Sequence, residues 1–286
     1  MLTRRTVLAG VGGVFAAGAA GRSFGAAREP LRCGLTPVLL TSDLDLLEAL
    51  RVYLTAATGR DVEIVTRRTY QEITSLLVSG QLDAAWICGY PFVAYRSELD
   101  LLAVPIWRGR PLYQSYLIAA ADRQARSIDD LAGDIHAFSD PDSNSGFLVT
   151  AAELAAKGQR PERFFHQTFF TYGHRNVVRA VASGLAQSGS VDGYVFEVLK
   201  EVEPSLTQAI RIVRASDWYA FPPMASPALA RGSARTAALR RALLGAHRDP
   251  AGQRLLAALR LDSFAEENPS LYAPIATNMN LVRSIG

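Results

Sequence analysis

The sequence contains little cysteine and little histidine. Its 286 residues include two cysteines, Cys33 and Cys88, and four histidines, none paired at the His-x-x-x-His spacing of many zinc enzymes. Both cysteines fall within apparent core strands, so we expect free buried thiols rather than a disulfide. The sequence therefore predicts no metal site.

Several enzyme motifs are also absent. The chain has no Gly-x-Gly-x-x-Gly fingerprint, no P-loop and no Gly-x-Ser-x-Gly elbow, which argues against a dinucleotide enzyme, an NTPase and an α/β-hydrolase. An exported hydrolase with Cys88 or Ser143 as nucleophile and His174 as base is the enzyme alternative, although no acid is evidently placed to orient His174. We therefore predict a protein that is not an enzyme and needs no cofactor.

The first 27 residues have the pattern of an export signal. Arg4-Arg5 precede an uncharged stretch from Thr6 to Ala20, and small residues follow up to Ala27. Paired arginines are typical of the twin-arginine route, and the apolar stretch is too short and too rich in glycine and alanine for a stable membrane span. We predict cleavage after Ala27, with Ala20 as the alternative, and a periplasmic mature protein.

Removing this leader also removes the net charge. The chain has 30 basic and 27 acidic residues, and the leader contains Arg4, Arg5 and Arg22 without an acidic residue. Taking these three from 30 leaves 27 basic residues against 27 acidic ones, so the pI of about 9.0 mostly reflects the leader. A neutral mature protein gives no indication of a nucleic-acid surface.

Strands alternate with capped helices in the first part of the mature chain. The segments Leu31–Thr36, Val62–Thr66 and Asp83–Cys88 are predicted strands. Thr69 with Glu72 forms a capping-box pattern at the start of the helix between the last two. This alternation is typical of an α/β sheet with crossover connections.

Two segments are predicted to cross between two lobes. The apolar run Tyr113–Ala121 leads into the second lobe, and Phe221–Pro223 suits an extended return, because proline is incompatible with a helix interior. We expect residues 28–115 and 222–286 to form the first lobe, and residues 116–221 to form the second.

The second lobe is predicted to hold a strand over Ile135–Phe138, a helix near Asn176–Leu185 and a strand-like segment over Ser190–Val195. Helical patterns at Ala234–Ala246 and Gly252–Leu261 then finish the chain against the first lobe. No repeats or low-complexity tracts occur in the mature part.

The most informative stretch, Asp140–Thr150, reads Asp-Pro-Asp-Ser-Asn-Ser-Gly-Phe-Leu-Val-Thr. It follows a predicted strand and runs into a helical pattern over Phe147–Lys157, which places Ser143-Asn144-Ser145 at the first helical turn. Free amides and the helix dipole there favour an anion, and Gly146 lets the backbone come close. A simple N-cap is the alternative for Ser143 or Asn144, but one cap needs only one such side chain.

Four places along the chain carry a resemblance to a known family. They are Leu31–Pro37, Thr69-Tyr70, Asp140–Val149 and Gly173–Ala182, and they span nearly the whole mature chain in order. At these places the sequence resembles the periplasmic phosphate/phosphite/phosphonate ABC-transporter substrate-binding proteins. The resemblance implies an α/β fold of the type II periplasmic binding protein class, in which two lobes, each a mixed sheet flanked by helices, close on a ligand and are joined by two crossing segments.

The resemblance also implies roles for individual residues. The turn Ser143–Gly146 would hold an oxyanion through hydroxyl and backbone donors. Tyr70 would add a phenol hydrogen bond from across the cleft, Tyr113 is the second matching tyrosine, and His174 would donate to an anionic oxygen. The alternatives are that both tyrosines belong to an interface core and that His174 caps the helix that follows it.

Two departures from the family bear on the ligand. Relatives that bind aminoalkyl phosphonates place carboxylates near the return crossing, whereas the return crossing of this chain contains none, and only Asp192 and Glu197 remain nearby. A smaller or non-amine anion is therefore expected, such as phosphate, phosphite or a simple phosphonate. Asp192 as an ordinary acid at a strand end is the alternative.

Cys88 is the second departure, because it stands at the end of a strand that would face the cleft. Certain relatives are sensors that bind arsenite through a cysteine and signal to a membrane kinase, and a thiol is a soft ligand suited to As(III). The alternative for Cys88 is a small buried hydrophobe.

The resemblance thus implies a monomeric solute-binding protein that captures a small phosphorus oxyanion and delivers it to a membrane ABC permease. An arsenite sensor that uses Cys88 and contacts a sensor-kinase ectodomain is the alternative.

Overall fold

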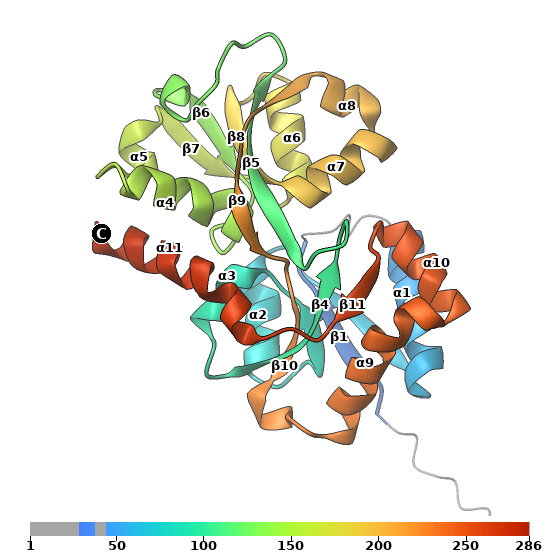
Figure 1. Ribbon diagram of the computed structural model, residues 1–286. Coiled ribbons are helices and arrows are strands. Elements are labelled where there is room, and N and C mark those ends of the chain that lie inside the picture. Colours follow the sequence, from blue (N-terminus) through green and yellow to red (C-terminus); the bar gives the residue numbers. More distant parts are fainter. Residues whose placement is uncertain (1–28, 38–43, 286) are drawn as a thin grey trace, which may run out of the picture.

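The computed structural model describes residues 29–37 and 44–285, so the predicted leader lies outside the described residues. Two mixed β-sheets, each flanked by helices, lie one above the other and are joined by extended segments (Figure 1). We call residues 29–111 with 221–285, which build the lower sheet, the first lobe. Residues 112–220, which build the upper sheet, are the second lobe.

The first lobe contains a six-stranded sheet in the order β11-β4-β10-β3-β1-β2. Its central strand β1 pairs in parallel with β2 and β3, whereas β10 and β11 run antiparallel to β4. The strands are β1 (Leu31–Leu35), β2 (Val62–Thr66), β3 (Ala84–Trp86), β4 (Leu99–Ile106), β10 (Met224–Pro227) and β11 (Ser263–Ala265). The α-helices are α1 (Leu44–Thr58), α2 (Tyr70–Val78), α3 (Gly89–Ala94), α9 (Ala234–Gly245), α10 (Pro250–Leu259) and α11 (Ala273–Ser284). Short 3-10 turns are η3 (Ala228–Ala230), η4 (Ala246–Arg248) and η5 (Pro269–Tyr272).

The second lobe contains a five-stranded sheet in the order β7-β6-β8-β5-β9. β6 is parallel to β7 and β8, while β5 runs antiparallel to β8 and β9. The strands are β5 (Leu112–Ala120), β6 (Ile135–Phe138), β7 (Gln167–Phe170), β8 (Ser188–Asp192) and β9 (Ile210–Ala220). The helices are η1 (Asp129–Leu131), the π turn η2 (Asn144–Leu148), α4 (Val149–Ala155), α5 (Pro161–Phe164), α6 (His174–Ala182), α7 (Gly193–Val202) and α8 (Pro204–Gln208).

Local sequence signals explain several element boundaries. The capping box predicted at α2 is confirmed: the Thr69 hydroxyl accepts the Glu72 amide, and the Glu72 carboxylate accepts the Thr69 amide. Gly80 follows this helix with a φ of +73°, a left-handed conformation that glycine adopts without strain.

Other predicted boundaries were wrong. The strand expected over Asp83–Cys88 is only β3, because Cys88 already occupies the N-cap position of α3. The segment expected over Ser190–Val195 changes from strand to helix at Asp192, whose carboxylate accepts the Val195 amide and so caps α7. The helical turn expected at Ser143–Ser145 is present as the π turn η2 from Asn144, but the helix expected to run to Lys157 already ends at Ala155.

A continuous apolar cluster passes through both lobes at the crossing segments. Phe221, fully buried on the return crossing, packs its ring 5.6 Å from that of Tyr113 and 5.1 Å from that of Tyr194. The expectation that both cysteines are free and buried is confirmed. Within residues 29–37 and 44–285, no helix has the length and apolar character that crossing a membrane requires.

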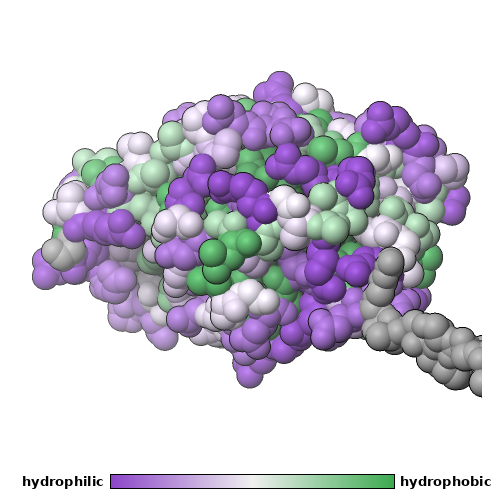
Figure 2. Space-filling model, turned by 90° about the horizontal axis from the view of Figure 1, so that it is seen from below, coloured by the Kyte–Doolittle hydropathy of each residue, from purple (hydrophilic) through white to green (hydrophobic). Residues whose placement is uncertain are grey.

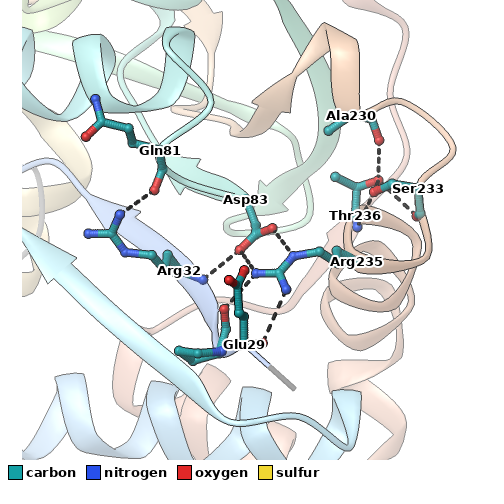
Figure 3. A network of polar contacts seen from close by, with 9 residues as sticks. Glu29, Arg32, Gln81, Asp83, Ala230, Ser233, Arg235 and Thr236 are labelled. Carbon is teal, nitrogen blue, oxygen red and sulfur yellow. Dashed lines mark hydrogen bonds and ion pairs between the residues drawn. The ribbon is translucent and has the colours of Figure 1, made fainter. Parts of the chain in front are cut away.

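The start of β1 is fixed to α9 by a charged network (Figure 3). The Arg235 guanidinium binds both carboxylate oxygens of Asp83 and also donates to the carbonyls of Glu29 and Pro30. Asp83 in turn accepts the Arg32 amide at 2.8 Å.

The first-lobe side of the surface is largely hydrophilic, with apolar residues scattered among charged ones (Figure 2).

Candidate functional site

The serine-rich turn joins β6 to α4 through a π-helical turn. Ser143 is its N-cap, and the Ser143 hydroxyl accepts the Gly146 amide at 3.0 Å. The wider turn is closed by the Leu148 amide, which donates to the Ser143 carbonyl at 3.0 Å. The capping alternative therefore describes the side chain of Ser143, while Asn144 and Ser145 lie at the tip of the turn with other partners.

Gly146 is required by packing inside the second lobe. A β-carbon at this position would lie 1.8 Å from Ser139 Oγ and 3.0 Å from His174 Cε1. The absence of a side chain therefore lets the turn pack directly on Ser139 and His174. The sequence suggested that Gly146 lets the backbone approach a ligand. The contacts with Ser139 and His174 are a separate reason for a glycine at this position.

Direct contacts between the lobes surround the tip of the turn. The Asn144 amide donates to Cys88 Sγ at 3.2 Å, and the Tyr70 hydroxyl lies 3.1 Å from His174 Nε2. The Tyr70 amide, at the first position of α2, donates to the Asp140 carboxylate at 3.2 Å. Each lobe thus caps a helix N-terminus of the other.

All the residues expected at the site lie in one buried cluster. We call them the inter-lobe site: Tyr70, Cys88, Tyr113, Ser143, Asn144, Ser145, Gly146, His174 and Asp192. Cys88 and His174 are the most exposed of the non-glycine members, each with 2% of its surface accessible. The cluster is therefore shielded from water, which strengthens each hydrogen bond made inside it.

The contacts of His174 fix its tautomer. Its Nδ1 accepts the Asp192 amide at 3.1 Å, so the proton of the neutral ring lies on Nε2, which faces the Tyr70 hydroxyl. Burial lowers the His174 pKa to about 3, so the ring is neutral at physiological pH. Because Nε2–H donates to Tyr70, the phenol keeps its own hydrogen for another acceptor.

Tyr113 is arranged in the same way. Its oxygen accepts a hydrogen bond from the Asn144 side-chain amide at 3.0 Å, which leaves the phenol hydrogen available. Burial raises the pKa of Tyr113 well above its ordinary value, as it does that of Asp192, and the nearby Ser145 hydroxyl offsets a small part of both rises. Ser145 Oγ nevertheless makes no hydrogen bond of ordinary geometry. The hydroxyl hydrogens of Tyr70, Tyr113 and Ser145 are therefore available to other acceptors.

Unpartnered polar atoms gather at this place. Ser139 Oγ, Asn144 Oδ1 and Ser145 Oγ are buried and have no hydrogen-bond partner among the described residues. Leaving such atoms unpaired costs about 1–3 kcal/mol each. A buried polar atom without a partner in the protein commonly binds an ordered water or an ion.

Negative charge, by contrast, is present only as buried carboxyl groups. Burial raises the pKa of Asp192 to about 7, although the amides of Val195 and Tyr194 and the Ser145 hydroxyl lower it. Burial also raises the pKa of Asp140. None of the nine site residues is lysine or arginine. The donors of these nine residues are therefore neutral groups.

The site gives little support to the alternative of an exported hydrolase. Burial raises the Cys88 pKa to about 12, so the thiol is not ionised, and the Ser143 hydroxyl is occupied as a cap. His174 is oriented by a backbone amide and not by a carboxylate. Among the described residues, no group of three or more His, Cys, Asp and Glu side chains is placed to hold a metal ion.

Two further residues shape the site without having been expected. Asp140 receives the Tyr70 amide, and its position after a strand and before a proline is a signal that the sequence did contain. Ser115 on β5 donates to the Ser145 carbonyl at 2.6 Å and so fixes the tip of the turn. Nothing in the sequence around Ser115 indicates this contact, because it depends on how β5 and the turn meet.

Comparisons with known proteins bear on the family and the fold. The family model described as "ABC transporter, phosphonate, periplasmic substrate-binding protein" matches residues 34–272. Among curated proteins, the chain is 28% identical over 174 residues to the phosphate-import protein PhnD of Mycolicibacterium smegmatis. This match covers 56% of the chain and 54% of PhnD, so the chain matches about half the length of this curated relative.

Solved structures confirm the two-lobed periplasmic binding protein fold. A binding protein component of an ABC phosphonate transporter from Pseudomonas aeruginosa has a TM-score of 0.82 at 20% identity, over 90% of this chain and 87% of that one. PhnD1 from Prochlorococcus marinus, in complex with methylphosphonate, has a TM-score of 0.79 at 17% identity, over 88% and 98%. The matched family binds substrate for a transporter and is not an enzyme family. The family model covers most of the chain, and the protein belongs to the family of periplasmic substrate-binding proteins of phosphonate ABC transporters.

Proposed function

We propose that this protein captures a phosphorus oxyanion (phosphate, phosphite or a simple phosphonate) between its two lobes and delivers it to a membrane ABC permease. The observation that carries the proposal is the set of free neutral hydroxyls of Tyr70, Tyr113 and Ser145 around the tip of the π turn. The hard oxygens of a phosphate-type anion accept hydrogen bonds from hydroxyl and amide donors. The names of the curated PhnD relative and of the methylphosphonate-bound PhnD1 support the same class of ligand.

The charges at the site support a small anion without an ammonium group. Asp192 has a pKa of about 7 and Asp140 accepts two backbone amides, from Tyr70 and Asp142. Glu197 pairs with Arg108 and Lys200. No carboxylate among these is both ionised and free to bind an ammonium. Asp192, with its raised pKa, is suited instead to share a proton with an oxyanion through a hydrogen bond.

In this proposal the lobes hinge at the two crossing segments, near Tyr113 and Phe221, and the two bodies divide close to residues 115 and 221. Closure brings Tyr70 from the first lobe to the serine-rich turn of the second and excludes water from the anion. The protein acts as a monomer. It reaches the periplasm by means of the leader over residues 1–27, cleaved after Ala27, and mass spectrometry of the exported protein tests that site.

The arsenite alternative gains no comparable support. Cys88 is a single thiol with a pKa raised to about 12 by burial, and Sγ already accepts the Asn144 amide. A soft-metal site needs thiolates, and Cys33, the other cysteine, lies within β1.

Isothermal titration of the mature protein tests the proposal. The anions are phosphate, phosphite, methylphosphonate, 2-aminoethylphosphonate and arsenite, each run against wild type, Ser145→Ala and Cys88→Ser. We expect saturable 1:1 binding of at least one of the first three, weakened by about 1–3 kcal/mol in Ser145→Ala because a hydrogen bond to a charged group is removed. Binding of arsenite alone, and only when Cys88 is present, would contradict the proposal.

A further inference from the structure

The C-terminal helix α11 lies across the boundary between the lobes. It leaves η5 in the first lobe and extends toward α4 of the second lobe, where the described chain ends (Figure 1). Its first turn packs on the first lobe: Ile275 is buried, and its Cδ1 lies so close to Gly89 at the start of α3 that a β-carbon on Gly89 would lie 2.5 Å from it. Just before the helix, the Tyr272 hydroxyl donates to the Phe221 carbonyl at 2.8 Å.

The rest of α11 contacts the second lobe. It packs against α4 and against the π turn whose tip forms the inter-lobe site. The Asn278 side chain donates to the Tyr219 hydroxyl on β9 at 2.9 Å. Arg160, just before α5, donates to the Ile285 carbonyl from Nε at 2.8 Å and also from a terminal guanidinium nitrogen. A cation at a helix C-terminus is additionally favoured by the helix dipole.

We propose that α11 is a strap that fastens the closed arrangement of the lobes. Because Ile275 packs α11 on α3 of the first lobe, opening must break the contacts of the helix on the other side, at Tyr219 and Arg160. The strap therefore positions the π turn against the first lobe from the outside, while from within Cys88 accepts the Asn144 amide of the turn and Tyr70 contacts His174. Its consequence for anion release rests on the proposed function, whereas its effect on closure does not.

A double variant, Arg160→Ala with Asn278→Ala, removes both sets of side-chain hydrogen bonds from the strap. The matched control is Arg163→Ala with Asn280→Ala, which makes the same change in charge and composition. Arg163 and Asn280 are exposed, and neither side chain makes a hydrogen bond or ion pair within the described residues. The single variant Arg160→Gln keeps a side chain of similar length and serves if the double variant does not fold.

The first measurement is hydrogen–deuterium exchange of the ligand-free mature protein. We expect amides in residues 273–285 and 144–155 to exchange several-fold faster in the double variant, with the first-lobe strands unchanged, because removing the strap raises the open population. The control should exchange like wild type. Equal protection of both segments in the double variant and the control would overturn the strap.

The second measurement is the dissociation rate of inorganic phosphate, phosphite and methylphosphonate, followed by tryptophan fluorescence after rapid dilution. We expect release about tenfold faster in the double variant and a proportionate rise in Kd, because two or three hydrogen bonds favour the closed form. Unchanged release of an anion that wild type binds would overturn the role of the strap in retention. If wild type binds none of the three anions, the proposed function fails, and the exchange measurement alone decides on the strap.

Discussion

Replacing Asp192 by asparagine should make the protein more stable at neutral and alkaline pH. Asp192 is 1% exposed, and burial raises the pKa of its carboxyl group from the ordinary 3.8 to about 7. Between these two values the folded protein keeps a proton that the unfolded chain has released. Since the folded state binds more protons, the free energy of unfolding falls as pH rises through this window.

The size of the effect follows from the two pKa values. The difference between about 7 and 3.8, at about 1.4 kcal/mol for each unit of pKa, amounts to about 4 kcal/mol. Asparagine keeps an oxygen that can accept the Val195 amide and cap α7, but it never ionises. Asp192→Asn should therefore match wild type near pH 4 and exceed its stability by as much as about 4 kcal/mol at pH 8.

Urea unfolding of the anion-free mature protein, followed by circular dichroism from pH 4 to pH 8, measures this difference. Two parallel stability curves, with no relative change between pH 4 and 7, would show that the carboxyl group is already ionised when folded. The same variant also tests whether Asp192 makes anion binding depend on pH. In wild type, binding of an oxyanion should weaken about tenfold for each pH unit above 7, because Asp192 and the anion then no longer share a proton, and Asp192→Asn should reduce this slope.

Three further substitutions test other parts of the structure. Gly146→Ala should destabilise the fold by about 1–3 kcal/mol in thermal unfolding, because its methyl group would overlap Ser139, and adding Ser139→Gly should restore part of the stability. Arg235→Ala should cost about 1–3 kcal/mol in urea unfolding, because it removes the hydrogen bonds to Asp83 and to the start of β1, whereas exposed Arg241→Ala on the same helix should be nearly neutral. Iodoacetamide should alkylate native Cys88 slowly, and more slowly still with saturating phosphate, as read by mass spectrometry. Faster alkylation with phosphate would contradict closure around the anion.

Much of the fold follows from local signals in the sequence. The capping box at Thr69 and the glycine after α2 mark the ends of one helix, and the prolines after Phe221 mark the return crossing. These signals depend on residues within a few positions of each other, so they can be read without knowing the tertiary structure. The serine-rich turn belongs to the same class, because a strand end followed by small polar residues is a local pattern.

The features that the sequence did not predict depend on distant contacts. The helix α11 has only Ile275 and Met279 fully buried, so its apolar periodicity is weak, and it is stabilised by packing against two separate parts of the chain. The packing of Gly146 against Ser139 and His174, which leaves no room for a side chain, was likewise not predicted. The roles of Asp140 and Ser115 likewise require the positions of α2 and β5 relative to the turn.

Two of the contacts between the lobes are exchanges of helix caps. The first amide of α2 donates to the Asp140 carboxylate of the opposite lobe. The first amide of the π turn donates to Cys88 Sγ of the first lobe. On opening, both amides and the carboxylate gain water in place of these partners, so each exchange favours closure by only about 0.5–1.5 kcal/mol. The unpaired Ser145 hydroxyl and Asn144 carbonyl oppose closure unless something bonds to them. The free energies of the open and closed arrangements are therefore expected to be close, and an anion that satisfies the remaining donors can decide between them.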